Sequence, residues 1–159
     1  NCNSFKYRQK TAISFQVATD FNELVVYVST WFGGGKQDIK QARKILNHMK
    51  IECALKDEDV FLLDCGYQGL KELPAIIPFK NPSKNSDRTL SLAQTQFNYT
   101  QRKYRSGIER TFGEIKNTYS CFGDIFNGSP DRCSELFRLA CALYNMRKRE
   151  QKGLQPIFF

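Results

Sequence analysis

The feature that most constrains this chain is the apolar run Val60-Phe61-Leu62-Leu63, which is followed at once by Asp64. A short segment that is apolar at every position is typical of a strand inside a parallel or mixed sheet, because such strands are covered on both faces. In α/β folds, the carboxyl ends of these strands form the edge where ligands bind. The sequence therefore predicts a strand over residues 60–63, with the carboxylate of Asp64 at a ligand-binding edge.

A second acidic residue, Glu109, lies in a segment with helical periodicity. Apolar residues recur there at spacings of three and four from Tyr104 to Tyr119, which predicts one long helix over about residues 92–119. Glu109 adjoins this stripe, one turn after Arg105. An i, i+4 ion pair with Arg105 is the ordinary interpretation. The order of the two acids along the chain instead favours a metal-dependent phosphoryl-transfer site.

The other segments complete an alternation of strands and helices within one domain over residues 1–159. Two β-rich runs, 11–19 and 24–30, predict a hairpin whose polar turn contains Asp20 as a turn residue and not as a catalytic one. We further expect a short helical or turn segment over 69–73, a strand over 75–79 and a mobile loop over 80–91. Ser129-Pro130-Asp131 opens a last helix, into whose core we place five residues: Leu136, Phe137, Ala140, Leu143 and Tyr144.

Asp38 allows two interpretations. It directly precedes an apolar stripe over residues 39–50, where it suits the N-cap of a helix. Alternatively, its carboxylate supports the predicted metal site. The glycines at 33–35 also permit a phosphate-binding loop, but no Gly-Lys-Ser/Thr sequence follows them, so the sequence does not favour a P-loop.

The net charge of +8 is concentrated between Lys80 and Lys116 and at the end of the last helix. Such a field attracts polyanions in a salt-dependent way, so the predicted partner is a nucleic acid and not a membrane or an acidic protein. Five basic residues flank the two acids and are the predicted DNA contacts: Arg102, Lys103, Arg105, Arg110 and Lys116.

The six cysteines show no metal-binding spacing, and the single histidine, His48, offers no partner for a nucleophilic triad. No apolar stretch approaches the ~20 residues of a membrane span, and no signal-peptide pattern opens the chain. We therefore expect reduced thiols in a nuclear or cytoplasmic protein that is not secreted.

Several motifs occur in a characteristic order: LLDCGYQG, AIIPFK, Asn98, Arg105, IERTFGEIKNTYSCF and LFRLACALYNM. In this order and spacing they resemble the C-terminal part of the nuclease domain of DDE-superfamily transposases of the Harbinger (PIF) type. The resemblance implies a ribonuclease H-like mixed sheet flanked by helices. Gly35 and Lys36 depart from the commonest form of the Gly-Ser-x-x-Asp motif that the family places before Asp38.

The resemblance also implies a DDE acid triad that binds two Mg²⁺ or Mn²⁺ ions, with Asp64 as the second acid and Glu109 as the third. The first acid normally lies on an earlier, central strand, and nothing in Asn1–Lys10 matches its motif. We therefore expect an N-terminally incomplete nuclease domain that lacks the first strand and is inactive alone. The alternative is an inactive or domesticated transposase fragment that acts in the nucleus as a DNA-binding or protein-interaction module. Such nucleases usually work with a separate DNA-reading partner protein, and the oligomeric state stays open.

Overall fold

The computed structural model describes residues 13–34, 37–53, 56, 58–82, 89–122, 126 and 128–155. The chain divides into two compact units, one of residues 37–106 and one of residues up to 36 together with 107–159. The long helix α2 (Leu92–Thr118) contributes to both units. That the chain is a single domain stays a prediction, and residues 83–88 of the predicted mobile loop lie outside the described residues.

The first unit contains a parallel strand pair, as predicted. Strand β5 (Phe61–Leu62) pairs with β6 (Ala75–Ile76), with Phe61 opposite Ala75 and Leu62 opposite Ile76. The prediction of a fully buried strand over 60–63 is wrong, because Val60 is 50% exposed and the next three residues are half-buried. In the described part of the chain β5 has one partner strand, so its apolar side chains are covered less than those of a central strand.

Helix α1 (Asp38–Glu52) packs the predicted apolar stripe inward, and the buried residues are Gln41, Ala42, Ile45, Leu46 and Met49. The prediction that Asp38 caps this helix is wrong. The N-cap is Gln37, whose carbonyl accepts hydrogen bonds from the backbone N–H groups of Lys40 and Gln41. Asp38 is instead the first helical residue, where a carboxylate interacts favourably with the positive end of the helix dipole.

Two segments of the first unit are shorter or earlier than predicted. A helical or turn segment is expected over 69–73; the helical part is the earlier 3₁₀ segment η1 (Cys65–Tyr67), and a turn at 68–69 follows it. Gly69 has a φ of 90°, which glycine adopts more readily than other residues. Strand β6 ends at Ile76 and does not continue to Phe79, whose backbone pairs with the side chain of Asn98 instead of with a strand.

The second unit contains the predicted hairpin. Strand β2 (Val17–Thr19) pairs antiparallel with β3 (Val25–Val28), and Asp20 Oδ1 accepts the Leu24 N–H at 2.8 Å inside the turn, which confirms Asp20 as a turn residue. The run predicted over 11–19 is split, because β1 (Ile13–Ser14) pairs with β4 (Phe32–Gly33), and residues 11 and 12 lie outside the described residues.

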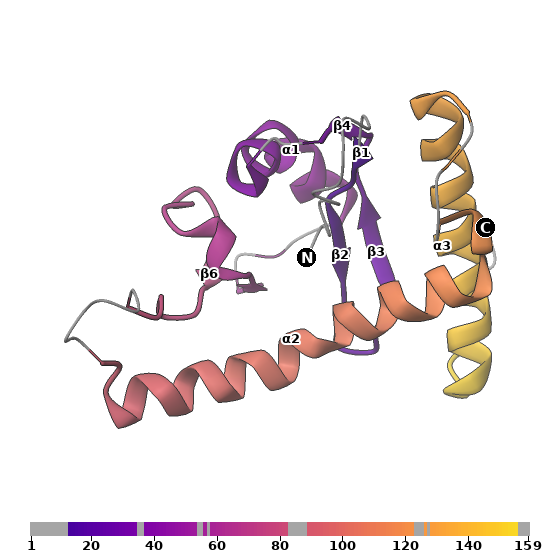
Figure 1. Cartoon of the computed structure of the whole chain (residues 1–159). Coiled ribbons are helices and arrows are strands. Elements are labelled where there is room, and N and C mark those ends of the chain that lie inside the picture. The colour runs from indigo at the N-terminus through magenta and orange to yellow at the C-terminus, as the bar shows by residue number, and fades with distance from the viewer. Residues whose placement is uncertain are drawn as a thin grey trace. The chain divides into compact units, whose positions relative to one another are not determined.

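Helix α3 (Pro130–Gln151) begins as predicted, with Pro130 in its first turn and Ser129 Oγ accepting the Arg132 N–H as the N-cap. It lies beside β3 and the last turns of α2, which the 3₁₀ segment η2 (Ser120–Phe122) follows (Figure 1). None of the described helices is long and apolar enough to span a membrane.

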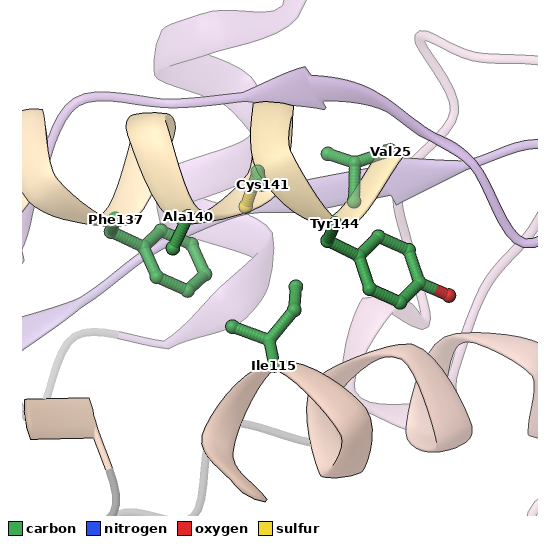
Figure 2. Packing of buried hydrophobic residues seen from close by; sticks show 6 residues of the cluster. All are labelled: Val25, Ile115, Phe137, Ala140, Cys141 and Tyr144. Carbon is green, nitrogen blue, oxygen red and sulfur yellow. The ribbon is translucent and has the colours of Figure 1, made fainter. Parts of the chain in front are cut away.

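The core of the second unit joins β3, α2 and α3. Figure 2 shows Ile115 of α2 pointing toward α3, and Val25 of β3 belongs to the same cluster. The other buried members, Phe137, Ala140, Cys141 and Tyr144, all come from α3. Phe15 stacks on Phe137 at a centroid distance of 4.8 Å.

Three residues predicted in apolar stripes are exposed: Tyr104 at 59%, Leu136 at 37% and Leu143 at 42%. The buried face of α3 contains Phe137, Cys141 and Tyr144. Successive residues of a helix are rotated by about 100°, so Leu136 and Leu143, each next to a buried residue, point away from this face. The described architecture is therefore α/β, with helices and three two-stranded sheets. A ribonuclease H-like arrangement that lacks its first strand stays a prediction.

Candidate metal and nucleic-acid site

Asp64 lies two residues after β5, at the turn into η1. Its Oδ1 accepts the Cys65 backbone N–H at 2.6 Å, which caps η1 and fixes one carboxylate oxygen. The other oxygen, Oδ2, lies 3.9 Å from Nη1 of Arg105, and the Asp64 side chain is 30% exposed. The carboxylate therefore stands at the surface, oriented by the backbone and with a cation beside it.

Three polar residues on one face of α2 hold the helix against the strand ends of the first unit. Asn98 makes a two-point clamp on Phe79: its Oδ1 accepts the Phe79 N–H at 2.8 Å and its Nδ2 donates to the Phe79 carbonyl at 2.9 Å. Gln101, 5% exposed, donates through Nε2 to the Leu63 carbonyl at 2.7 Å. These contacts place Arg105, one turn further along, at Asp64.

The role of Gln101 was not predicted from the sequence. Its position in series with Asn98 and Arg105, at spacings of three and four, is the signal that could have found it. A polar residue in a helix is usually assigned to the solvent face, because polar side chains are mostly exposed. The exception arises because Gln101 satisfies a backbone carbonyl at a strand end, which the helix sequence alone does not reveal.

Asp38 lies against the turn that follows Asp64. A Cβ atom added to Gly66 would be 3.3 Å from Asp38 Oδ2, so the absence of a side chain at position 66 makes room for this carboxylate. Two carboxylates, from α1 and from the end of β5, thus belong to the same region of the first unit. Carboxylate oxygens are the ligands that Mg²⁺ and Mn²⁺ prefer. The donor chemistry therefore fits a hard divalent cation.

Glu109 is exposed on α2, in the part that belongs to the second unit, whereas Asp64 belongs to the first. That the carboxyl oxygens of Asp64 and Glu109 lie within about 10 Å of each other, as two-metal catalysis requires, stays a prediction. Within the described residues, no three His, Cys, Asp or Glu side chains are grouped closely enough to hold a metal ion.

The five predicted DNA contacts have different environments. Arg102, Lys103 and Lys116 are exposed on α2. Arg105 lies beside Asp64, and Arg110 pairs with Glu23 through Nη2 at 2.5 Å and Nε at 2.8 Å. The first three therefore present their charge to solvent, while the guanidinium of Arg110 is held by a carboxylate within the second unit.

An ion cluster around Glu23 was not predicted from the sequence. Glu23 has a φ of 64° in the hairpin turn, and its Oε2 lies 2.9 Å from Lys148 Nζ, which also donates to Glu114 Oε1 at 2.9 Å. The Glu23 and Lys148 side chains are only 15% and 11% exposed. The cluster thus ties the hairpin turn to α2 and α3.

Charge pairing shifts the pKa values of Glu23 and Lys148. Burial opposes ionisation of Glu23, but hydrogen bonds from Lys148 and Arg110 outweigh it and hold the pKa of Glu23 below its ordinary 4.5. Burial likewise opposes the charge of Lys148, and hydrogen bonds to Glu114 and Glu23 outweigh it and raise the pKa of Lys148. Both groups are therefore charged at neutral pH, and the cluster is a structural ion pair.

The described cysteines, Cys53, Cys65, Cys121, Cys133 and Cys141, are free thiols, as predicted. Cys65 adjoins the candidate site and is exposed. Desolvation, followed by the hydrogen bond and charge of Asp64, raises the pKa of its thiol. Since the thiolate is the form that attacks electrophiles, a raised pKa makes Cys65 a weaker nucleophile.

The family model described as DDE superfamily endonuclease matches residues 1–145 of the chain. The chain therefore belongs to the DDE superfamily endonuclease family. Comparisons with curated proteins and with solved structures give no match. The family confirms the coarser part of the resemblance in the sequence, because its members are transposase-like nucleases that act on DNA with divalent metal ions.

Proposed function

We propose that this chain is the Mg²⁺-dependent DNA endonuclease and strand-transfer domain of a Harbinger-type transposase, acting in the nucleus. Asp64 and Glu109 bind the metal, and Asp38 supports them. The observation that carries the proposal is the setting of Asp64: a carboxylate at the end of a parallel-paired strand, with Arg105 at 3.9 Å and Asp38 against the same turn.

The chemistry requires hard oxygen ligands. When bound, a pair of divalent ions activates the attacking oxygen and stabilises the leaving oxygen of a phosphodiester. The Cys65 N–H donates to Oδ1 and orients the Asp64 carboxylate, so that Oδ2, which lies beside Arg105, is the oxygen that would bind the cation. Arg105 neutralises Asp64 in the free protein and would turn to a DNA phosphate when a cation takes its place.

The exposed basic residues supply the second part of the function. Arg102 and Lys103 lie on the same helix as Arg105, and Lys116 lies further along it. Lysine and arginine side chains bind phosphate oxygens and fix the position of a duplex without reading its sequence. We therefore assign these residues to the DNA backbone, and sequence recognition to a separate DNA-reading protein.

The proposal is tested by metal binding and by nicking. Mn²⁺ binding to the purified chain is measured by electron paramagnetic resonance, and nicking on supercoiled plasmid with Mg²⁺. Asp64→Asn is expected to weaken Mn²⁺ binding at least tenfold and to abolish any nicking, because it removes an anionic ligand. Glu58→Gln, a change at an exposed acid of the same unit, serves as the control and is expected to leave both unchanged.

Glu109→Gln and Asp38→Asn separate the roles of the other two acids. Weaker Mn²⁺ binding in Glu109→Gln, with DNA binding retained, would support Glu109 as a metal ligand. If Asp64→Asn leaves the Mn²⁺ affinity unchanged, the proposed site is wrong. DNA binding by a wild-type chain that does not bind Mn²⁺ would favour the alternative function, a domesticated transposase module that binds DNA or protein.

A further inference from the structure

Helix α3 carries an apolar stripe on the face opposite its core contacts. Four large apolar residues are exposed there: Leu136 at 37%, Leu139 at 55%, Leu143 at 42% and Met146 at 64%. Large side chains gathered in this way are costly to leave in water, and such patches usually mark interaction sites. The stripe lies wholly within the second unit.

The spacing of the stripe is three, four and three residues, which is the spacing of the a and d positions of a coiled coil. Leu136 and Leu143 take one of these positions, and Leu139 and Met146 take the other. The stripe therefore forms a narrow seam about two heptads long, which suits one partner helix better than a broad surface.

The charges beside the seam differ at its two ends. Glu135 lies next to the first seam residue, and Arg149 lies next to the last, both on the same flank of the helix. Between them, on the same flank, is exposed Ala142, whose small side chain allows close approach. Two copies of such a helix, with an acidic residue at one end of the seam and a basic residue at the other, bring opposite charges together when they run antiparallel.

We propose that this seam binds the same seam of a second copy of the chain, with the two α3 helices antiparallel about a two-fold axis near Ala142. In a two-fold interface, if residue i contacts residue j, then j contacts i. Leu136 then packs against the partner's Met146, and Leu139 against the partner's Leu143. Glu135 faces the partner's Arg149 in both halves of the interface.

Charge determines the direction of pairing. In an antiparallel pair the flank that carries Glu135 and Arg149 faces the same flank of the partner, so the two charges meet, whereas in a parallel pair this flank faces the partner's other flank and they do not. The antiparallel pair therefore gains two attractions that the parallel pair lacks. Arg149 uses Nη1 for the Gln155 carbonyl, at 3.0 Å, and a guanidinium has five N–H donors, so one such bond leaves capacity for a carboxylate.

The first test is the mass of the chain as a function of concentration, measured by sedimentation equilibrium. Because the seam is short, we expect a weak dimer that dissociates on dilution. Leu139→Lys and Leu143→Lys are each expected to give a monomer throughout. Phe21→Lys, a change at a residue that is 78% exposed in the same unit but distant from α3 in sequence, is the control and should leave the dimer intact.

The second test is a charge exchange. Glu135→Arg and Arg149→Glu should each weaken self-association, because each replaces two attractions with two repulsions. Mixed together, the two variants should form a heterodimer in which both ends are again attractive. Circular dichroism and thermal melting check that each variant is folded.

A chain that stays monomeric at all concentrations would overturn the proposal, as would a dimer that survives both lysine substitutions. A dimer strengthened by Glu135→Arg would overturn the antiparallel direction. All these measurements report mass and need neither metal nor DNA, so their failure leaves the proposed nuclease function untouched.

Discussion

The side-chain amide of Gln101 donates a 2.7 Å hydrogen bond to the backbone carbonyl of Leu63, the residue before Asp64. This bond joins α2 to the strand end that carries the candidate acid. Together with the Asn98 clamp on Phe79, it fixes the helix face from which Arg105 reaches Asp64. The position of the acid relative to its cation thus depends on a polar residue that is hydrogen-bonded to the backbone just before the acid.

Replacing Gln101 with leucine should therefore disturb both stability and the site. The Leu63 carbonyl would lose its partner in a partly buried place, which costs about 1–3 kcal/mol in the free energy of unfolding. Urea denaturation measures this loss, and Mn²⁺ titration measures the effect on Asp64. Gln96→Leu, at an exposed position of the same helix, is the matched control. Equal stability of the two variants would contradict the role assigned to Gln101.

The sequence predicted the long elements well, because their signals are local. Helical periodicity defined α2 to within a residue, and Ser129 with Pro130 marked the first turn of α3. The turn at Asp20 was predictable for the same reason. Parallel pairing of β5 followed from its apolar run, although its length and burial did not, since those depend on which other strands lie beside it.

Long-range polar contacts were not predictable. Thr111 is fully buried, and its hydroxyl lies 3.3 Å from the hydroxyl of Tyr144, but a threonine among the polar residues of α2 gives no sign of this. Lys148 lies in a basic run that suggests solvent or DNA, yet it is buried against Glu23. The partners of these residues are distant in sequence, so no local pattern contains them.

Lys148 should be essential to the stability of the second unit. Lys148→Met keeps the length of the side chain but leaves Glu23 and Glu114 without their shared cation. We expect a loss of about 2 kcal/mol, below the usual cost of removing one partner from a fully buried ion pair, because Arg110 and Arg147 remain beside the two acids. Lys116→Met, at an exposed position of α2, should change the free energy of unfolding by less than about 0.5 kcal/mol.

The Glu23 cluster also predicts a pH dependence. The pKa of Glu23 is lower in the folded chain than its ordinary 4.5, so its stabilising contribution is complete above that value and is lost as the pH falls through the folded pKa. The pKa of Lys148 is raised, so its contribution is complete at neutral pH and is lost only in strongly alkaline solution. Urea denaturation of wild type and Glu23→Gln should show a difference at pH 7 that shrinks below pH 4.5. A difference that is constant with pH would show that Glu23 acts by packing and not by charge.

The affinity for DNA should depend on the exposed basic side chains of α2 and on the salt concentration. The triple variant Arg102→Ala, Lys103→Ala, Lys116→Ala is expected to bind a random duplex more weakly, with a salt slope smaller by about 0.9 for each phosphate that the variant no longer neutralises. Fluorescence anisotropy at several salt concentrations measures both quantities. The control removes the same net charge from exposed lysines of α1, with alanine at Lys40, Lys44 and Lys50. Equal weakening in the two triple variants would mean that net charge alone attracts DNA.

Gly66 offers a test of Asp38 that leaves every candidate ligand in place. The Cβ of Gly66→Ala would lie 3.3 Å from Asp38 Oδ2, so the carboxylate must shift by a few tenths of an ångström. If Asp38 supports the metal, Mn²⁺ affinity should fall about tenfold, the scale expected when the groups that orient metal ligands are disturbed. Gly113→Ala is the control: apart from its chain neighbours and the backbone of its own helix, no atom lies within 4 Å of the added Cβ. Alanine inside a helix should raise stability by about 0.5–1 kcal/mol without changing Mn²⁺ affinity. Unchanged affinity in a folded Gly66→Ala chain would remove Asp38 from the proposed site and leave Asp64 and Glu109 as its acids.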